Sequence, residues 1–221
     1  MNFSLITTED GSHSLYSSEL NESYHSIHGA LSESMHIFIE AGLNEVIKTK
    51  NALNILEVGF GTGLNAFLTR FFCEDMNIQT SYYGVEAFPV SKEIYSQLNY
   101  HTILNKTNQQ YFLDLHTAEW DKSVQISENF LLKKHLAPIS EVSIPDNFFD
   151  LVYFDAFAPQ YQPEMWTVGI FEKIYKSMSN EAILTTYCCK GDVKRALKSV
   201  GFQIEKLPGP KGKREMLRAR K

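Results

Sequence analysis

Residues 54–68 read NILEVGFGTGLNAFL, in which an apolar run ends in an acid and alternate glycines before an amphipathic pattern begins. The residues of this segment that could do chemistry are Glu57, Gly59, Phe60, Gly61 and Gly63. Glycine lets the backbone turn tightly and lets a ligand press against the main chain. A helix that follows such a turn also offers free N–H groups. We therefore predict a cofactor-binding turn, although glycines also occur in tight turns that bind nothing.

A second acid, Glu86, lies near the end of the next apolar segment, TSYYGVEAF at residues 80–88. A carboxylate at a strand end suits two adjacent ribose hydroxyls, because it accepts both O–H hydrogen bonds. The glycine turn and this acid together predict a cofactor that contains a nucleoside, bound in part by Glu86 and the adjoining Ala87.

The glycine spacing separates two cofactor classes. The dinucleotide fingerprint is G-x-G-x-x-G, whereas this chain has G-x-G-x-G. With Glu57 two residues ahead of the first glycine, the pattern resembles the first motif of class I S-adenosyl-L-methionine methyltransferases. An acid near the turn suits the cationic amino-acid end of that cofactor, which has no phosphate to be held. We favour S-adenosyl-L-methionine over NAD.

A third acid, Asp155, follows the apolar segment 148–154 in DLVYFDAFAP. A strand there would deliver Asp155 to the carboxyl edge of the sheet, next to the glycine turn. The segment is similar to the same strand end of amine-directed methyltransferases of this class, where an acid or amide precedes prolines. We predict that Asp155 is catalytic: it accepts an N–H bond from a substrate amine and offsets developing positive charge. With an ordinary pKa of about 4 it would be a poor general base.

Further segments resemble one family of RNA-modifying enzymes. DAFAP, PEMW, GFGTGLN, VEAFP, GKREM and the opening DGSHSLYSSELNESYHSIHGALSES are similar to the methyltransferases that complete 5-methylaminomethyl-2-thiouridine at the tRNA wobble position. The resemblance implies methyl transfer from S-adenosyl-L-methionine to the amine of 5-aminomethyl-uridine, with tRNA as partner. In many bacteria this module is fused to an FAD-dependent oxidase. The chain ends where the oxidase would begin and has no second dinucleotide motif, so we expect methyl transfer alone, without FAD.

The resemblance also implies roles around the site. A lid over the cofactor or nucleoside is expected from Tyr24, His25 and Ser26. Tyr161 and Trp166, close to Asp155, suit either stacking on a flipped base or packing in the core. The acidic dipeptide that binds adenine in such enzymes is not evident, because LLKKHLAPIS stands in its place. The adenine contacts around Leu136–Ile139 are therefore not assigned.

The charge distribution suggests where RNA could bind. The chain carries a net charge of −5, yet residues 206–221 contain seven Lys or Arg and one acid. A local positive stripe can serve phosphate binding on an acidic protein, whereas a solvated basic terminus would serve no partner. The candidates for phosphate contacts are Lys190, Lys211, Lys213 and Arg214.

Strands that alternate with helices must position these residues. From residue 53 onward this alternation predicts an α/β class I methyltransferase fold, a Rossmann-like doubly wound sheet with an antiparallel strand in its terminal pair. Asp10-Gly11 predicts a hairpin, and residues 30–42 predict a helix that stops at Gly42. We expect an N-terminal hairpin and helix extension over 1–50 and a Rossmann-like domain over 51–221, together one compact unit. Further helices are expected at 89–98, 108–119, from Pro163 onward, and at 192–201.

Several classes of protein are disfavoured. Residues 1–20 do not resemble a signal peptide and no apolar run is long enough to span a membrane, so we expect a cytoplasmic protein. The three cysteines are too few for a disulfide framework, and His25, His28 and His36 form no tight set of metal ligands.

Three other functions stay open at this point. The first is a class I methyl- or aminopropyltransferase that acts on a small amine. An oxidoreductase is disfavoured by the glycine spacing. A non-catalytic RNA-binding module is disfavoured because Gly61, Glu86 and Asp155 occur together.

Overall fold

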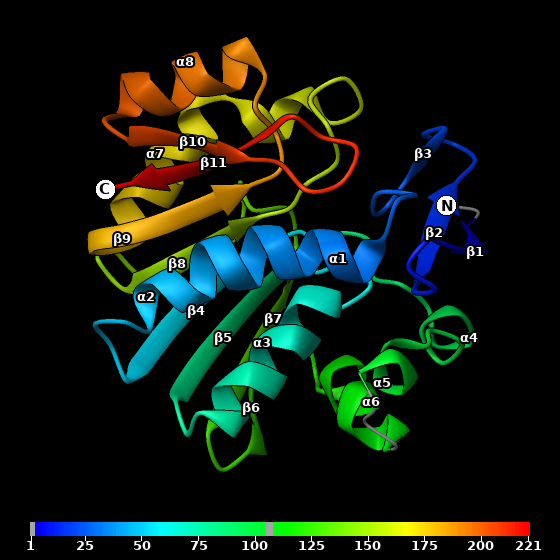
Figure 1. Cartoon of the computed structure of the whole chain (residues 1–221). Coiled ribbons are helices and arrows are strands. Elements are labelled where there is room, and N and C mark those ends of the chain that lie inside the picture. Colours follow the sequence, from blue (N-terminus) through cyan, green and yellow to red (C-terminus); the bar gives the residue numbers. More distant parts are fainter. Residues whose placement is uncertain (1–2, 105–107) are drawn as a thin grey trace.

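A sheet of eight strands runs through the centre of the molecule (Figure 1), in the order β10-β11-β9-β8-β4-β5-β7-β6. The computed structural model describes residues 3–104 and 108–221. The strands of this sheet are β4 (Ala52–Val58), β5 (Gln79–Glu86), β6 (Ser123–Ser127), β7 (Phe130–Leu136), β8 (Phe149–Phe154), β9 (Met178–Thr186), β10 (Gln203–Pro208) and β11 (Glu215–Arg220). Strands β9, β8, β4, β5 and β7 are parallel, whereas β6 and β11 pair antiparallel with their neighbours. The predicted fold class is confirmed, including the antiparallel strand of the terminal pair.

The central strands are apolar because both faces of the sheet are covered. Every residue of β8 is buried, and in β4 the side chains of Leu53, Ile55, Leu56 and Val58 are at most 2% exposed. Continuous apolar runs of this kind are typical of parallel strands between two helical layers.

Helices form a layer on each face of the sheet. On one side, η1 (Met35–Leu43), α3 (Leu64–Asp75) and α6 (Gln109–Thr117) share a core with Ile55. On the other, α7 (Val168–Ser177) and α8 (Gly191–Val200) share a core with Leu56. The short helices are α1 (Ala30–Ser34), α2 (Asn44–Val46), α4 (Lys92–Tyr95), α5 (Tyr100–Ile103) and the 3₁₀ turn η2 (Pro163–Trp166). Within residues 3–104 and 108–221, no helix has the length and apolar character needed to cross a membrane.

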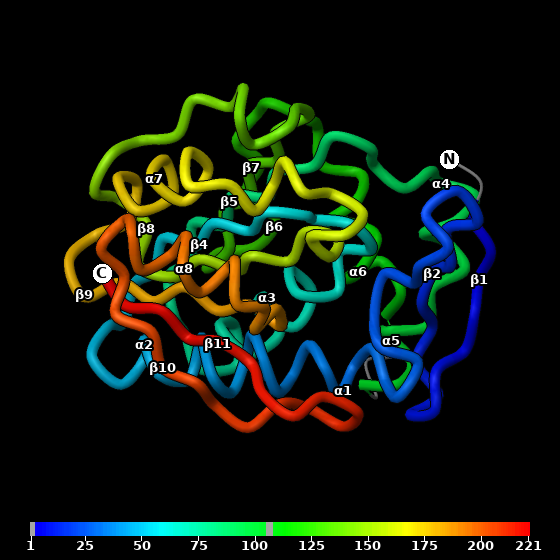
Figure 2. Tube along the Cα trace, turned by 90° about the horizontal axis from the view of Figure 1, so that it is seen from above, coloured from blue at the N-terminus to red at the C-terminus, as the bar shows by residue number. Residues whose placement is uncertain are grey.

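A second, three-stranded sheet lies at one end of the molecule, beside α4 and α5 (Figure 2). Its strands are β1 (Phe3–Thr7), β2 (His13–Ser17) and β3 (Glu22–Ser23), and the predicted hairpin joins the first two. Gly11 adopts φ 83 at the turn, and its carbonyl accepts a hydrogen bond from the side chain of Asn99 at 2.9 Å. The small sheet is thus held against the residues that precede α5. The domain boundary expected at residue 50 stays a prediction.

The helix after this sheet differs from the prediction. It does not stop at Gly42, because η1 is π-helical over Met35–Leu43 and continues into α2. A Cβ placed on Gly42 would lie 3.3 Å from Cγ2 of Thr185 on β9. Gly42 is therefore a packing position against the main sheet, and helix η1 belongs to the layer that covers it.

Other differences lie at short elements. Strand β6 was not predicted, because it is short and breaks its register with β7 between Gln125 and Ser127. The helix expected at 89–98 is reduced to the single turn α4, with α5 as a separate turn. Pro163 opens η2 rather than the long helix, since extended Thr167 separates η2 from α7.

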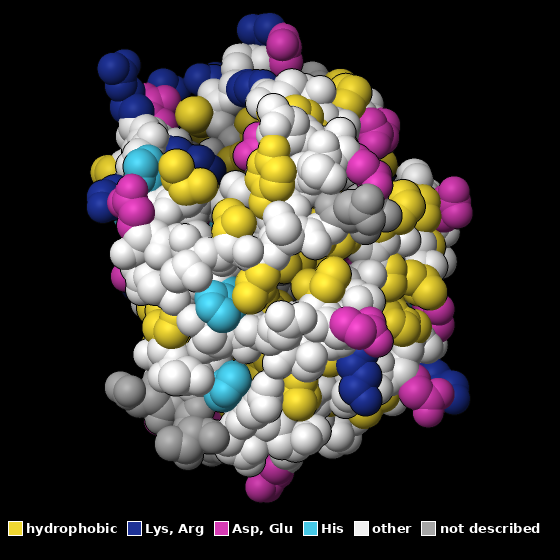
Figure 3. Space-filling view, turned by 90° about the vertical axis from the view of Figure 1, so that its right-hand side faces the viewer, with side chains coloured by type: hydrophobic (Ala, Val, Ile, Leu, Met, Phe, Trp, Pro, Cys, Tyr) yellow, Lys and Arg dark blue, Asp and Glu magenta, His cyan; other side chains and the backbone are white. Residues whose placement is uncertain are grey.

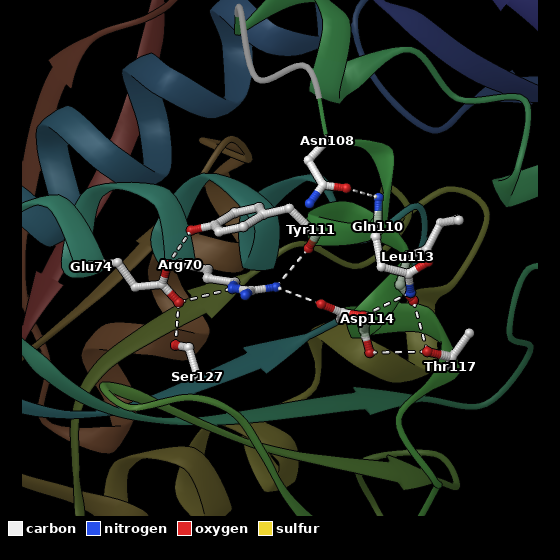
Figure 4. A network of polar contacts seen from close by, with 9 residues as sticks. All are labelled: Arg70, Glu74, Asn108, Gln110, Tyr111, Leu113, Asp114, Thr117 and Ser127. Carbon is white, nitrogen blue, oxygen red and sulfur yellow. Dashed lines mark hydrogen bonds and ion pairs between the residues drawn. The ribbon is translucent and has the colours of Figure 1, made fainter.

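A network around the buried Arg70 connects α3, α6 and the end of β6 (Figure 4). Arg70 is 5% exposed, and its guanidinium donates to Glu74 at 2.9 Å and to the carbonyl of Tyr111 at 2.7 Å. Glu74 also accepts a hydrogen bond from Ser127. Buried charge is tolerated here because the guanidinium has a carboxylate partner and a carbonyl acceptor. The network fixes α6, whose His116 contacts the carbonyl of Thr62 in the glycine turn at 3.1 Å.

Candidate active site

A cavity of about 780 Å³ opens at the carboxyl edge of the main sheet. Its wall includes the residues that follow β4, β5, β7, β8 and β9, and residues 22–27 of the N-terminal region. The predicted site residues that line it are Tyr24, His25, Ser26, Gly59, Phe60, Gly61, Glu86, Ala87, Asp155, Lys190 and Lys213. The predicted residues that do not line it are Glu57, Gly63, Lys211 and Arg214. The structure therefore brings most of the predicted residues around one space.

The three glycines of the turn have different tasks. All three have positive φ, at 93 for Gly59, 50 for Gly61 and 74 for Gly63. A Cβ on Gly59 would lie 2.5 Å from the carbonyl oxygen of Asp155, and one on Gly63 would lie 2.9 Å from Nε2 of His116. These two glycines allow close packing inside the protein. A Cβ on Gly61 would instead meet the ring of Tyr24 at 3.1 Å, so Gly61 is the glycine whose free side faces the cavity lining.

Glu86 connects the glycine turn to the end of β5. One carboxylate oxygen accepts the N–H of Gly61 at 2.9 Å, and the other accepts the N–H of Phe88 at 2.9 Å. Each oxygen has further acceptor capacity. Glu86 is thus fixed beside the turn and lines the cavity with acceptor groups, as the binding of two adjacent hydroxyls requires.

Glu57 lies beneath the cavity rather than in its wall. Its side chain is fully buried, because it points from β4 toward the helix layer that contains α3, and Asn65 and Tyr82 lie beside it. In the part of the chain that is described, neither carboxylate oxygen has a hydrogen-bond partner. Burial raises the pKa of Glu57 well above its usual range, and the nearby carboxylate of Asp155 raises it as well. Direct contact with a cofactor, expected from the sequence, is not supported by this position.

Asp155 follows β8 and faces the cavity. Its backbone N–H donates to the carbonyl of Val58 at 2.9 Å, and its carboxylate accepts the amide N–H of Asn65 at 2.9 Å. Burial raises the pKa of Asp155 to about 7, although the hydrogen bond from Asn65 opposes this. The sequence alone suggested an ordinary carboxylate, which is corrected here because the enclosing protein disfavours the charged form. At neutral pH the protonated and charged forms of this carboxyl group are therefore both populated.

Residues 24–26 form the part of the wall opposite the strand ends. The ring of Tyr24 packs edge-on against Phe157, with centroids 4.9 Å apart, above the glycine turn. Nδ1 of His25 lies 3.0 Å from the hydroxyl of Ser14, and burial lowers the pKa of His25 to about 4, so the ring is neutral at pH 7. The N–H of Ser26 donates to the carboxylate of Glu33 at 2.8 Å.

The basic C-terminal segment is neither a free terminus nor an unpaired stripe. Lys211 pairs with Glu9 at 2.8 Å, Lys213 with Glu33 at 2.6 Å, and Arg220 with Glu45 at 2.8 Å. Further pairs in the segment are Lys206–Glu215 and Arg218–Glu205. Figure 3, which views the side of the N-terminal sheet, shows acidic side chains close to the Lys and Arg side chains at its margins. Much of the local charge is thus neutralised by acids from other parts of the chain.

Among the residues of the cavity wall that were not predicted, three fix other parts of the wall. Asn65 holds Asp155, Glu33 holds Ser26, and the hydroxyl of Tyr187 donates to the carbonyl of Ala156 at 2.8 Å. Asn65 stands in the quoted segment GFGTGLN as a polar residue at the start of an apolar helix, which is a usable signal. Glu33 lies in an amphipathic helix where an acid is ordinary, so the pattern gave no reason to single it out.

The sequence left two points open: whether Tyr161 and Trp166 stack on a base, and which residues contact adenine. The structure answers both in part. Trp166 is a core residue: it is 6% exposed and its indole N–H donates to the carbonyl of Phe157 at 2.8 Å. Tyr161 does not line the cavity. Where the adenine contacts were unassigned, the wall is formed by Ala137, Pro138, Ile139 and Ser140. No cluster of three potential metal ligands occurs among the described residues.

The family follows from comparison with known sequences. A family model described as S-adenosyl-L-methionine-dependent methyltransferase matches residues 98–221, which is more than half of the chain. The chain belongs to this family. Its methyl donor is S-adenosyl-L-methionine, as the glycine spacing predicted.

Individual relatives of this methyltransferase have informative names. It is 30% identical over 213 residues to the tRNA 5-methylaminomethyl-2-thiouridine biosynthesis bifunctional protein MnmC of Nitrosospira multiformis, covering 92% of this chain and 34% of that protein. It is 30% identical over 238 residues to the MnmC protein of Burkholderia pseudomallei, covering 96% of this chain and again 34% of the relative. The chain thus spans about a third of the length of these relatives.

A solved structure shares the fold across almost the whole chain. The crystal structure of MNMC2 from Aquifex aeolicus superposes with a TM-score of 0.78 and 25% sequence identity. The match covers 99% of this chain and 70% of that one. The N-terminal region and the C-terminal hairpin are therefore included in the similarity.

The cavity fits S-adenosyl-L-methionine on three observations. Gly61 lines the cavity without a side chain, next to the ring of Tyr24, and Glu86 is fixed beside it as an acceptor. Asn65 lines the same space, and its amide oxygen is buried with no hydrogen-bond partner among the described residues. An orphaned acceptor in an acidic wall suits a ligand that carries an ammonium group and a sulfonium.

Proposed function

We propose that this methyltransferase transfers a methyl group to the primary amine of 5-aminomethyl-uridine at the wobble position of tRNA. The observation that carries the proposal is the position of Asp155, which lies in the same cavity as the glycine turn and Glu86. The tRNA-modifying relatives, matched over more than nine tenths of the chain, support the class of substrate. A tRNA substrate would place the activity in the cytoplasm.

The residues that would hold the cofactor are those of the glycine turn around Gly61, Glu86 with Ala87, and residues 137–140. When bound, S-adenosyl-L-methionine supplies an electrophilic methyl group on its sulfonium. The proposal is restricted to methyl transfer, because only about a third of each bifunctional relative is matched. That the chain works without FAD stays a prediction.

Asp155 would orient the amine and receive its proton. An amine that resembles lysine has a pKa of about 10.4, so most of it is protonated at neutral pH. Transfer of that proton to an ordinary carboxylate would be very unfavourable. The raised pKa of Asp155, about 7, reduces the cost by an amount on the order of 4 kcal/mol. Asn65 fixes the carboxylate through its hydrogen bond, so that the remaining lone pairs point to a defined place.

Contacts with tRNA phosphates are proposed for Lys190, Lys211, Lys213 and Arg214. Arg214 is exposed, and Lys190 lies on the cavity wall, where it donates to Gln160. These two are the stronger candidates, because Lys211 and Lys213 already have carboxylate partners. An exposed pair such as Lys211–Glu9 is easily exchanged for a phosphate, whereas the less exposed Lys213–Glu33 pair is not.

The proposal is tested by mass spectrometry of wobble nucleosides in tRNA from cells that lack this protein. Accumulation of 5-aminomethyl-uridine derivatives at the expense of the methylated form is the expected result. An unchanged nucleoside profile, together with methylation of a free polyamine by the purified chain, would favour a small-amine transferase instead. Methylation by the purified chain of tRNA isolated from those cells, which would carry the aminomethyl group, provides the matched assay in solution.

A further inference from the structure

A partly buried ion pair joins two distant parts of the chain at the cavity. Glu33 on α1 is 7% exposed, and one of its oxygens accepts a hydrogen bond from Nζ of Lys213 at 2.6 Å. The other oxygen accepts the N–H of Ser26 at 2.8 Å. Both side chains line the cavity, although the two residues lie 180 positions apart in sequence. The pair thus closes the wall between the N-terminal region and the loop that connects β10 to β11.

Lys213 has a second contact, which leads toward Asp155. Its ammonium lies 4.1 Å from the centroid of the Tyr187 ring, a distance at which a cation is attracted by an aromatic face. The hydroxyl of Tyr187 donates to the carbonyl of Ala156 at 2.8 Å. One ammonium group therefore contacts both the carboxylate that holds Ser26 and the ring that holds the residue next to Asp155.

We propose that Glu33 and Lys213 are positioning residues for the methyl-transfer step. Their ion pair holds residues 24–26 against the segment that carries Asp155 and thereby keeps the cavity closed over that carboxyl group. This inference rests on the proposed function, because it takes Asp155 as the group that receives the amine.

The charges of the pair also act on Asp155. The groups that face Asp155 from the surrounding elements are the amide of Asn65 on α3, Glu57 on β4, Tyr82 on β5, Tyr187 after β9, Glu33 on α1 and Lys213. After burial and the Asn65 hydrogen bond, the negative charge of Glu33 raises the pKa of Asp155 and the positive charge of Lys213 lowers it. Loss of the Glu33 charge should therefore lower the pKa of Asp155, and loss of the Lys213 charge should raise it.

The decisive test is the titration of the Asp155 carboxyl group in the free protein, followed by NMR with ¹³C-labelled aspartate. Glu33→Gln should lower the midpoint and Lys213→Met should raise it, each by roughly half a pH unit or more. The double variant should return close to the wild-type midpoint, because the two charges are removed together. Lys211→Met is the matched control: it lies in the same loop, but its partner Glu9 does not line the cavity, so the midpoint should not move.

Kinetics test the positioning role itself. In single-turnover assays with saturating cofactor and tRNA, Lys213→Met should slow methyl transfer by roughly tenfold or more, since the wall opposite Asp155 is no longer held. Lys213→Arg keeps the charge and should retain most of the rate. If Glu33→Gln does not fold, the comparison of Lys213→Met with Lys213→Arg still gives the test.

A wild-type single-turnover rate in Lys213→Met would overturn the positioning role, and equal midpoints in Lys213→Met, Lys211→Met and the wild type would overturn the coupling of the pair to Asp155. The titration needs no RNA, so it distinguishes two kinds of failure. A wild-type protein that methylates no tRNA, but whose Asp155 midpoint moves as expected in the variants, would contradict the proposed function and leave the coupling of the pair to Asp155 intact.

Discussion

The two walls of the cavity are brought together in different ways. One wall consists of strand ends that are neighbours in the sheet, with Gly61 after β4, Glu86 at the end of β5 and Asp155 after β8. The facing wall joins residues 24–26 to Lys213, from opposite ends of the chain. The first wall forms once the parallel strands are in register. The second forms only when the two ends of the folded chain come together. The difference indicates that the chemistry rests on rigid elements and that access depends on long-range contacts.

Replacing Asp155 should have the largest effect on the strand-end wall. Asp155→Ala is expected to slow methyl transfer by roughly 10²–10⁴-fold, the range for a positioned proton acceptor or charge-stabilising group. The fold should remain intact, because Asp155 lies beyond the end of β8. Single-turnover rates with saturating cofactor and tRNA measure the effect, and a wild-type rate would remove Asp155 from the active site.

The variant Asp155→Asn separates orientation from charge. An amide oxygen still accepts an N–H bond, but it neither takes up a proton nor carries charge. Because the pKa of Asp155 is raised to about 7, the wild-type rate should rise with pH up to that value as the acceptor ionises. The Asn variant should lack this contribution and should keep only the shallower rise that comes from deprotonation of the substrate amine. A rate in the Asn variant close to that of the wild type would mean that orientation alone matters.

Gly61→Val tests the turn on the same wall. Valine is strained at φ 50, and its Cβ would lie 3.1 Å from the ring of Tyr24. We expect the affinity for S-adenosyl-L-methionine to fall by roughly a hundredfold or more, given backbone strain of about 1–3 kcal/mol and a blocked approach. Isothermal titration calorimetry measures this, with Gly169→Ala as the control, since a Cβ on Gly169 meets nothing within 4 Å. Unchanged affinity would show that the cofactor does not approach this turn.

Glu57, which lies beneath the strand-end wall, allows that wall to be tested through the stability of the fold. Its pKa is raised by burial, so the folded protein binds this proton more tightly than the unfolded chain. The corresponding stability is present at low pH and is lost as pH rises above the unfolded value, by up to about 1.4 kcal/mol per pH unit. Glu57→Gln should therefore flatten the decline in the free energy of unfolding between pH 5 and pH 8. Chemical denaturation at several pH values measures it, and an equally steep decline would contradict the assignment.

Much of the strand-end wall could be predicted because its signals are local. Glycines before a helix and acids after apolar runs identify positions at one edge of a parallel sheet, and the order of the strands then brings them together. The expected cofactor contact of Glu57 is the part that the structure does not support, because Glu57 does not line the cavity. Alternation along β4 sends it to the face that also carries Ile55, between the sheet and α3, although it precedes the turn by only two residues.

The facing wall was harder to predict, since its contacts join residues that no local pattern relates. The acids that pair with the basic C-terminal segment are Glu9, Glu33 and Glu45, and nothing in the sequence around them distinguishes them from other acids. The raised pKa of Asp155 was missed for a similar reason, because burial is a property of the folded surroundings. The number of Lys and Arg residues in the C-terminal segment therefore overstated how many positive charges are available to bind phosphate.

The smallest expected effect concerns Arg214, an exposed positive charge of the basic C-terminal segment. Arg214 is exposed, whereas Lys211 in the same loop is paired with Glu9. If Arg214 contacts a phosphate, Arg214→Ala should lower the slope of log affinity for tRNA against log salt by about one contact. Lys211→Ala should change the slope less, because its ion pair must first be broken. Fluorescence anisotropy over a salt series measures both, and affinity for S-adenosyl-L-methionine should stay constant as the control. Identical slopes in Arg214→Ala and the wild type would place the RNA on another face, and the basic segment would then serve only to close the cavity wall through Lys213.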